Sequence, residues 1–282
     1  SAASDVYKRQ LWMKNRKQHR KHWMHYKMRD QIRFKIGKEE KNIQEKWIEI
    51  PEGTEHIQMM IEMPEEFQYM AFLFLEDPKK EIRFQKLLGY GQQNPGIGKS
   101  TKDTTIGGVP GEIYPGTWKI GIGIFTEYVA QKLGEQTGEI VLTVSDRKDV
   151  VSDPIGGECW VENGLHVSEQ SYRWENVFCP ESGWYKGDFH THTRLSDGKE
   201  TIGHASERAE ESGLDFYVPT EHNLMHTGWC KTSLCVLPGI EVTTDKGHMN
   251  LFGITEMPEK IPEIVNCLLY TSDAADDRIS VD

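Results

Sequence analysis

Two histidines and an aspartate lie within eight residues of one another in the segment GDFHTHTRLSDG, which spans residues 187–198. Side chains two positions apart on a strand point to the same face, so His190 and His192 can offer ring nitrogens to one ion while Thr191 faces away. Asp197 returns from the turn that follows, which Gly198 helps to close. This spacing predicts the first half of a metal site.

Three more motifs with the same chemistry follow, each after a run of β-forming residues. Glu221 and His222 lie in PTEHN, Glu241 lies in PGIEVTT, and His248 lies in KGHMN. A ligand set that mixes imidazoles and carboxylates suits zinc, manganese or iron. No Ser-His-Asp or Cys-His arrangement competes with these motifs, so the predicted chemistry is that of bound metal ions.

In order and spacing, these motifs resemble the PHP domain (polymerase and histidinol phosphatase type) over roughly residues 185–254. The form GDFHTHT followed by SDG is most similar to the branch called CehA/McbA-type metallohydrolases. The chain departs from the family at Glu221, because an aspartate usually precedes the histidine there. The resemblance implies that this carboxylate contacts the metal ligands rather than the metal.

The metal ligands implied by the resemblance are His190, His192, Asp197, His222, Glu241 and His248. Within this set, the two histidines of the HTH motif would bind one metal, and Asp197 with His222 would bind another. Glu241 would bridge two metals, and His248 would complete a neighbouring position. The expected cofactors are therefore two or three divalent ions (Zn, Mn or Fe).

The predicted function is that of a metal-dependent hydrolase, a phosphoesterase in which a metal-bridging hydroxide attacks a small-molecule phosphate ester. A first alternative, from the CehA/McbA resemblance, is hydrolysis of an ester or carbamate by the same hydroxide. A second alternative, from another class, is a non-catalytic binding module with a degenerate metal site. Turnover of aryl phosphates against aryl esters would separate the first two.

The elements around the motifs follow a β-α-β rhythm. Residues 201–212 have Ile202, Ala205 and Ala209 at helical spacing, and Gly213 provides a C-terminal cap. A strand is expected at 216–218, with further apolar runs at 234–237 and 251–254. Together with the resemblance, this rhythm predicts the first part of a PHP-type (β/α)7 barrel over residues 185–266. Such a barrel needs around 200 residues or more, so it cannot close within this chain.

Residues 31–177 predict a separate antiparallel β-sandwich domain that is jelly-roll-like. Apolar residues alternate with period two in the runs 57–63, 118–124 and 140–144, and turn residues separate these runs. Residues 167–186 are the expected connection between the two domains. The glycine patterns at 96–100 and 121–123 each lack a required glycine, so no nucleotide cofactor is assigned.

Composition and charge narrow the class of partner. The chain has 37% hydrophobic residues and no apolar run approaching the ~20 residues of a membrane helix, so a soluble protein is expected, cytoplasmic or exported. The net charge of −11 argues against general nucleic-acid binding. The basic segment 11–30 is interpreted as a solvated helix or arm.

Both ends of the chain look foreign. Residues 1–10 and 267–282 resemble translated sequencing-adapter read-through, so they are expected to be non-native tails and are excluded from the fold argument. On this hypothesis the native sequence is cut at both ends, and further metal ligands of the barrel lie beyond it.

Overall fold

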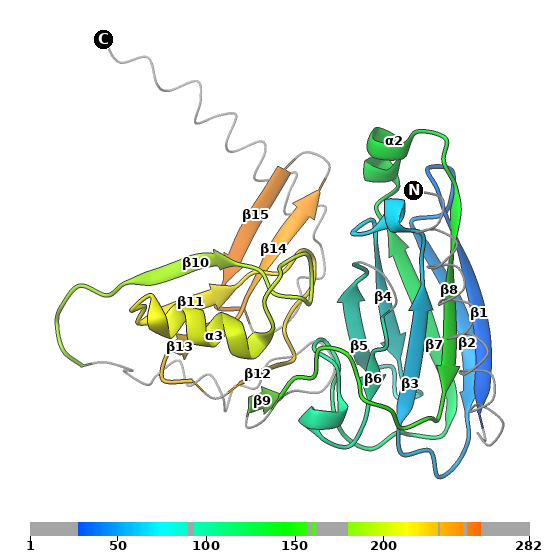
Figure 1. The fold of residues 1–282 in the computed structure, drawn as a ribbon, viewed down its shortest axis with the longest axis horizontal. Coiled ribbons are helices and arrows are strands. Elements are labelled where there is room, and N and C mark those ends of the chain that lie inside the picture. The colour runs from blue at the N-terminus through cyan, green and yellow to red at the C-terminus, as the bar shows by residue number, and fades with distance from the viewer. Residues whose placement is uncertain are drawn as a thin grey trace, which may run out of the picture.

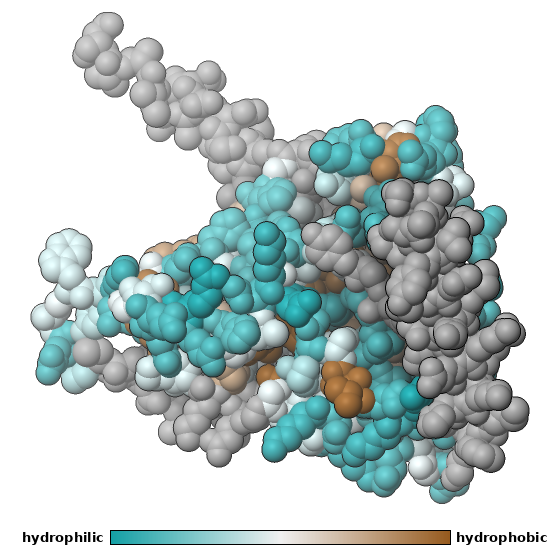
Figure 2. All heavy atoms as spheres, viewed as in Figure 1, coloured by the Kyte–Doolittle hydropathy of each residue, from teal (hydrophilic) through white to brown (hydrophobic). Residues whose placement is uncertain are grey.

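The computed structural model describes residues 28–89, 93–156, 159–161, 180–230, 232–244 and 247–254. Both expected tails lie outside these residues, as do most of the basic segment 11–30 and most of the expected connection 167–186. Among the described residues, no helix is long and apolar enough to cross a membrane. The face drawn in Figure 2 is largely hydrophilic, with apolar residues in small separate areas.

Two four-stranded antiparallel sheets form the N-terminal part of the protein (Figure 1). The first sheet has the order β1-β8-β3-β6, with β1 (Arg29–Ile36), β8 (Gly138–Ser145), β3 (Ile57–Glu62) and β6 (Gly96–Ile97). The second has the order β2-β7-β4-β5, with β2 (Ile43–Ile50), β7 (Gly116–Ile124), β4 (Ala71–Glu76) and β5 (Ile82–Leu87). The short helices η1 (Glu65–Phe67) and η2 (Thr101–Asp103) lie in the connections, and α2 (Thr126–Leu133) follows β7.

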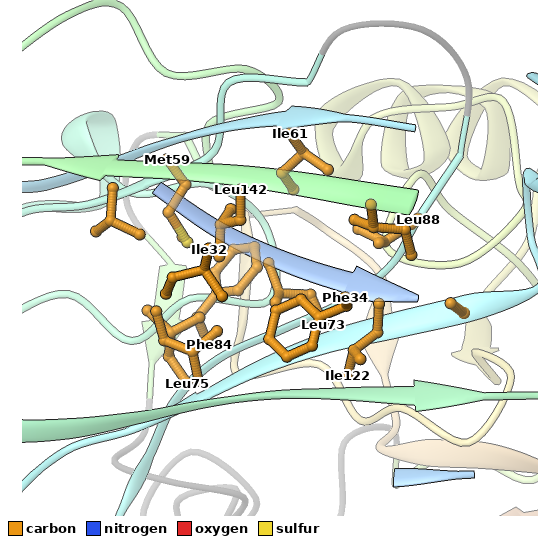
Figure 3. Packing of buried hydrophobic residues seen from close by; sticks show 14 of the residues in the cluster. Ile32, Phe34, Met59, Ile61, Leu73, Leu75, Phe84, Leu88, Ile122 and Leu142 are labelled. Atoms are coloured by element: carbon orange, nitrogen blue, oxygen red, sulfur yellow. The ribbon is translucent and has the colours of Figure 1, made fainter. Parts of the chain in front are cut away.

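The period-two runs of the sequence explain how these sheets pack. In β1, every second residue from Ile32 is buried, and the neighbouring positions are exposed. The inward side chains of both sheets form one hydrophobic core, in which Phe34 and Leu142 from one sheet pack with Leu73 and Ile122 from the other (Figure 3). Burial of these side chains is the main driving force that holds the sheets together.

The glycines of β7 serve packing. Gly121 lies opposite Phe74 of β4, and Gly123 lies opposite Phe72. A Cβ atom at Gly121 would lie 2.0 Å from the Phe74 ring, and one at Gly123 would lie 2.3 Å from the Phe72 ring. Both glycines therefore leave room for an aromatic ring on the neighbouring strand.

The C-terminal part combines a small parallel sheet with hairpins. The parallel sheet has the order β10-β11-β13, with β10 (Gly187–Thr191), β11 (Phe216–Pro219) and β13 (Cys235–Val236). Helix α3 (Ile202–Glu211) packs on this sheet, where Ser206 Oγ lies 2.9 Å from Tyr217 Oη (Figure 1). Strands β14 (Gly239–Thr244) and β15 (Gly247–Phe252) pair antiparallel, as do β9 (Cys159–Val161) and β12 (Gly228–Cys230).

The fold class predicted from the sequence, a jelly-roll-like sandwich followed by the first part of a (β/α)7 barrel, is wrong because the described residues of the C-terminal part do not form such a barrel. The described residues consist mainly of antiparallel sheets, with two α-helices and no closed barrel. Only two residues separate β14 from β15, whereas a parallel crossover needs a dozen or more, so these strands pair antiparallel. Between β11 and β13 the chain forms β12, which pairs with β9, in place of the helix that a barrel requires.

A second hydrophobic core joins the two parts of the protein. Leu87, Ile106 and Ile155 come from the N-terminal part and pack with Leu195 and Trp229 of the C-terminal part. The backbone N–H of Leu87 donates to the carbonyl oxygen of Leu195 at 3.0 Å, which extends the edge of β5 toward the loop after β10. The predicted metal-binding loop therefore packs directly on the N-terminal sheets.

Candidate metal centre

Alternate side chains at the end of β10 point to opposite sides, as the sequence predicts. Thr191 faces β11, because its hydroxyl donates to the carbonyl oxygen of Val218 at 3.0 Å and its own carbonyl accepts from the N–H of Thr220 at 2.8 Å. His190 and His192 lie on the other side, and their Nε2 atoms are 3.0 Å apart. The HTH motif thus places two imidazoles together at the end of a parallel strand.

The loop that carries Asp197 is closed by backbone hydrogen bonds. The N–H groups of Ser196 and Gly198 both donate to the carbonyl oxygen of Thr193, at 3.2 and 2.9 Å. A Cβ atom at Gly198 would lie 2.3 Å from the carbonyl oxygen of His192, so only glycine permits this close approach. The tight turn brings Asp197 back toward the histidine that precedes it, with Oδ1 3.7 Å from His192 Nδ1.

Glu221 organises this loop from a fully buried position. Its Oε1 accepts from the Thr193 N–H at 2.8 Å, from the Thr193 hydroxyl at 2.6 Å and from His226 Nε2 at 2.6 Å. Its Oε2 accepts from the Ser196 hydroxyl and lies 4.0 Å from His192 Nδ1. Burial opposes ionisation, but hydrogen bonds from His226, Ser196 and Thr193 outweigh burial and lower the pKa of Glu221.

His222 is held between the loop and the hairpin. Its Nδ1 lies 2.6 Å from the Thr243 hydroxyl, and its Nε2 lies 3.4 Å from Asp197 Oδ2. The next residue, Asn223, has a left-handed backbone (φ 51°), and its side-chain amide exchanges two 2.9 Å hydrogen bonds with the Thr243 backbone. Asparagine tolerates this conformation better than most residues, so the PTEHN motif fastens the end of β11 to β14.

The β14–β15 hairpin contributes the last two predicted ligands. Glu241 pairs with Asn250 across the hairpin, so His248, two residues earlier on β15, is its diagonal neighbour on the same face. The His248 Nδ1 atom lies 2.7 Å from Glu241 Oε1. A parallel bridge between Glu241 and His222 places this face of the hairpin against the end of β11.

Glu241 is the centre of the cluster. Its side chain is only 3% exposed, and four imidazoles surround it. Its Oε2 lies 3.2 Å from His190 Nε2, 3.1 Å from His192 Nε2 and 3.2 Å from His222 Nδ1, while Oε1 faces His248. The structure therefore brings all six predicted ligand side chains into one cluster.

Three overlapping groups in this cluster could hold a metal ion, because in each group the ligand atoms lie within 4.8 Å of one another. The groups are His190, His192 and Glu241; His192, Asp197 and His222; and His222, Glu241 and His248. Two imidazole nitrogens 3.0 Å apart need either a shared proton or a shared cation between them. The donor set and its spacing fit a divalent cation bound by nitrogen and oxygen atoms.

The electrostatics of the site favour anionic carboxylates. Burial opposes ionisation of Glu241, but hydrogen bonds from His248 and His190 outweigh it and lower the pKa of the carboxyl group. The hydrogen bond from His222 lowers the pKa of Asp197. Both carboxylates are therefore ionised at neutral pH, which is the protonation state that a metal ligand requires.

The two central histidines differ in their pKa shifts. Burial lowers the pKa of His192, and the surrounding carboxylates offset only part of that effect. Burial also disfavours the charged form of His222, but the hydrogen bond and charge of Asp197, with the charge of Glu241, outweigh it and raise the pKa. A cation at His222 would thus take the place of a proton that the carboxylates favour.

Sequence reasoning missed the residues that hold these ligands in place. Buried His226 and Ser196 both donate to Glu221, and Thr243 contacts His222. Lys86 on β5 donates from its buried amine to the carbonyl oxygen of Arg194 in the loop that carries Asp197. No periodicity in the sequence marks these residues, because each acts through a contact formed only on folding.

Comparison with known proteins assigns this chain to no family. A search of protein-family models finds no match for this chain, and a search of curated proteins finds none either.

Proposed function

We propose that the protein is a metal-dependent hydrolase that acts on phosphate esters, as the motif resemblance to PHP-type enzymes implies. The observation that carries this proposal is Glu241, a buried carboxylate within 3.2 Å of nitrogen atoms from four histidines. Such a concentration of imidazole nitrogens around one carboxylate is the kind of ligand set that binds divalent zinc, manganese or iron.

Two divalent ions satisfy the ligand set better than three. His192, His222 and Glu241 each belong to two of the three possible groups. A carboxylate readily bridges two ions through its two oxygens, whereas a neutral imidazole has one lone pair and serves one ion. We propose that one ion binds at His190, His192 and Glu241 and that a second ion binds at His222. Zinc, manganese or iron fits both positions.

Divalent ions at this site would neutralise the charge of a phosphoryl group and lower the pKa of a bound water. The protein's own residues would fix the ligands. Ser196 lies 3.4 Å from His192 Nδ1, and Thr243 lies 2.6 Å from His222 Nδ1, so each imidazole is oriented through one nitrogen. Such contacts keep ligands in a productive geometry, and their loss typically lowers metal affinity 10- to 100-fold.

Calorimetric titration with Mn²⁺ and Zn²⁺ tests the metal site directly. Glu241→Gln removes the shared carboxylate charge, so it should abolish tight binding, while Glu207→Gln on the exposed face of α3 is the matched control. Binding that survives Glu241→Gln unchanged would refute the site.

Turnover of phenyl phosphate, bis-aryl phosphate and aryl ester, each with and without added Mn²⁺ or Zn²⁺, tests the reaction. The proposal expects metal-dependent release of phosphate. Activity confined to the carboxyl ester would replace the phosphoesterase with an ester hydrolase, and metal binding without any turnover would favour a binding module.

A further inference from the structure

A cavity of about 600 Å³ opens between the metal cluster and the N-terminal sheets. Asp197, His222 and His248 line one side. The opposite side comes from the N-terminal part, where the end of β7, the first turns of α2 and the turn before β4 meet. The volume lies in the range of small-molecule sites, and a substrate that reached the ligands would contact both parts of the protein.

The N-terminal side of this cavity is aromatic. Tyr69, Phe125 and Tyr128 line it together with Leu87 and Ile124. Among the described residues that line the cavity there is no lysine or arginine, and the polar residues on this side are Asn42, Thr126, Glu127 and Gln131. A flat, uncharged group on the substrate would find apolar contacts on this wall, whereas the Glu127 carboxylate would repel a second anionic group.

Tyr69 is held in the wall by a strained backbone. Its φ is +60°, which is uncommon for an aromatic residue, and its N–H donates to the carbonyl oxygen of Leu88 at 2.7 Å. A Cβ atom at Gly89 would lie 3.2 Å from the Tyr69 ring, so the glycine leaves space for the ring. Strain of this kind is kept where the surroundings determine it, and it gathers at ligand sites.

Phe125 and α2 are fixed just as firmly. The Phe125 N–H donates to the carbonyl oxygen of Met70 at 2.9 Å, and its ring lies 6.0 Å from that of Phe72. The Thr126 hydroxyl donates to Asn42 Oδ1 at 2.9 Å. Tyr69 and Phe125 are therefore held in place before any ligand arrives, which lowers the entropic cost of binding.

We propose that this wall, formed by Tyr69, Phe125 and Tyr128, binds the aromatic group of a phosphomonoester whose phosphoryl group faces the metal ligands. The proposal rests on the function proposed above. In the reaction, water adds to phosphorus and the P–O bond to the aromatic alcohol breaks. The products are inorganic phosphate and the phenol, which takes a proton from the water.

Two non-hydrolysable probes isolate the aromatic contact. Phenylphosphonate and methylphosphonate carry the same phosphonate group and differ only in the ring, so calorimetry on the full chain with Mn²⁺ compares them directly. The wall predicts about tenfold tighter binding of phenylphosphonate. Tyr128→Ala and Phe125→Leu should each reduce this preference about threefold or more. Tyr185→Ala should leave it unchanged, because Tyr185 is as exposed as Tyr128 (45% against 42%) but does not line the cavity.

Equal binding of the two phosphonates, or a preference that survives both wall substitutions, would overturn the proposal. Turnover of phenyl phosphate is measured in parallel. Turnover without the phenyl preference would refute the wall and leave the hydrolase. A phenyl preference lost in both variants, without turnover, would support the wall and refute the hydrolase.

Discussion

Lys86 is a charged residue buried at the junction of the two parts of the protein. Its side chain is only 5% exposed, and its amine donates to the carbonyl oxygen of Arg194 in the loop that carries Asp197. The nearest carboxylate, Asp153, is 4.0 Å away and also pairs with the Arg194 guanidinium at 3.1 Å. Burial lowers the pKa of Lys86 from 10.5 to about 8, and the charges of Asp153 and Glu221 offset only part of this effect.

This shift makes stability depend on pH. Below about pH 8, the folded and unfolded chains both carry the proton, and the folded protein bears the full cost of the buried charge. Between about pH 8 and 10.5, the unfolded chain binds the proton and the folded chain does not, so stability rises with pH. At about 1.4 kcal/mol for each pH unit, the gain from this one group is about 3 kcal/mol.

Lys86→Met removes the titrating amine and keeps an unbranched side chain of similar length. Urea unfolding of both proteins from pH 7 to 10.5, in a chelator that removes metal ions, gives the free energy of unfolding at each pH. The wild-type value should rise by about 3 kcal/mol relative to the variant across this range. Lys102→Met, which removes an exposed lysine, is the control and should follow the wild type. Parallel curves for wild type and Lys86→Met would refute the reasoning.

Three other substitutions test the loop and the helix. Glu221→Gln weakens the hydrogen-bond acceptor for four donors, so Mn²⁺ affinity measured by calorimetry should fall about 10- to 100-fold. An unchanged affinity would show that the carboxylate does not position the loop. Leu195→Ala leaves a cavity in the core between the two parts and should lower the free energy of unfolding in urea by about 2–5 kcal/mol; a loss below about 1 kcal/mol would contradict that packing. Gly203→Ala adds a methyl group to α3 at a position with no other atom within 4 Å. The substitution should stabilise the protein by about 0.5–1 kcal/mol and so raise the thermal unfolding midpoint. A lower midpoint would show that the methyl group does not fit there.

The sequence predicted those elements whose pattern is local. The period-two runs form β3, β7 and β8, with their alternate apolar residues in the core. The helix expected at 201–212 is α3, whose first turn is capped by the Thr201 hydroxyl and which is followed by Gly213 at φ +66°. Periodicity and capping residues indicate such elements because they depend on neighbours a few positions away.

The arrangement of the later strands was predicted wrongly because it depends on distant contacts. The β-α-β rhythm ended after one unit, as β14 turned back on β15 and β12 paired with β9. The two residues between β14 and β15 exclude a parallel crossover, a signal present in the sequence. Nothing local indicates that β9 is the partner of β12, because the pairing joins segments far apart in the chain.

The sequence by itself determined the chemistry that is available, since six imidazole and carboxylate side chains stand at the ends of β-forming runs. Tertiary structure decided how these side chains come together. They surround buried Glu241, and the loop that carries Asp197 is hydrogen-bonded to β5. The cluster also lies beside an aromatic wall from the N-terminal part of the chain. The physical reason is one of range. Alternation and turn chemistry act between neighbouring residues, whereas burial, pKa shifts and cavities arise only when packing brings distant residues together.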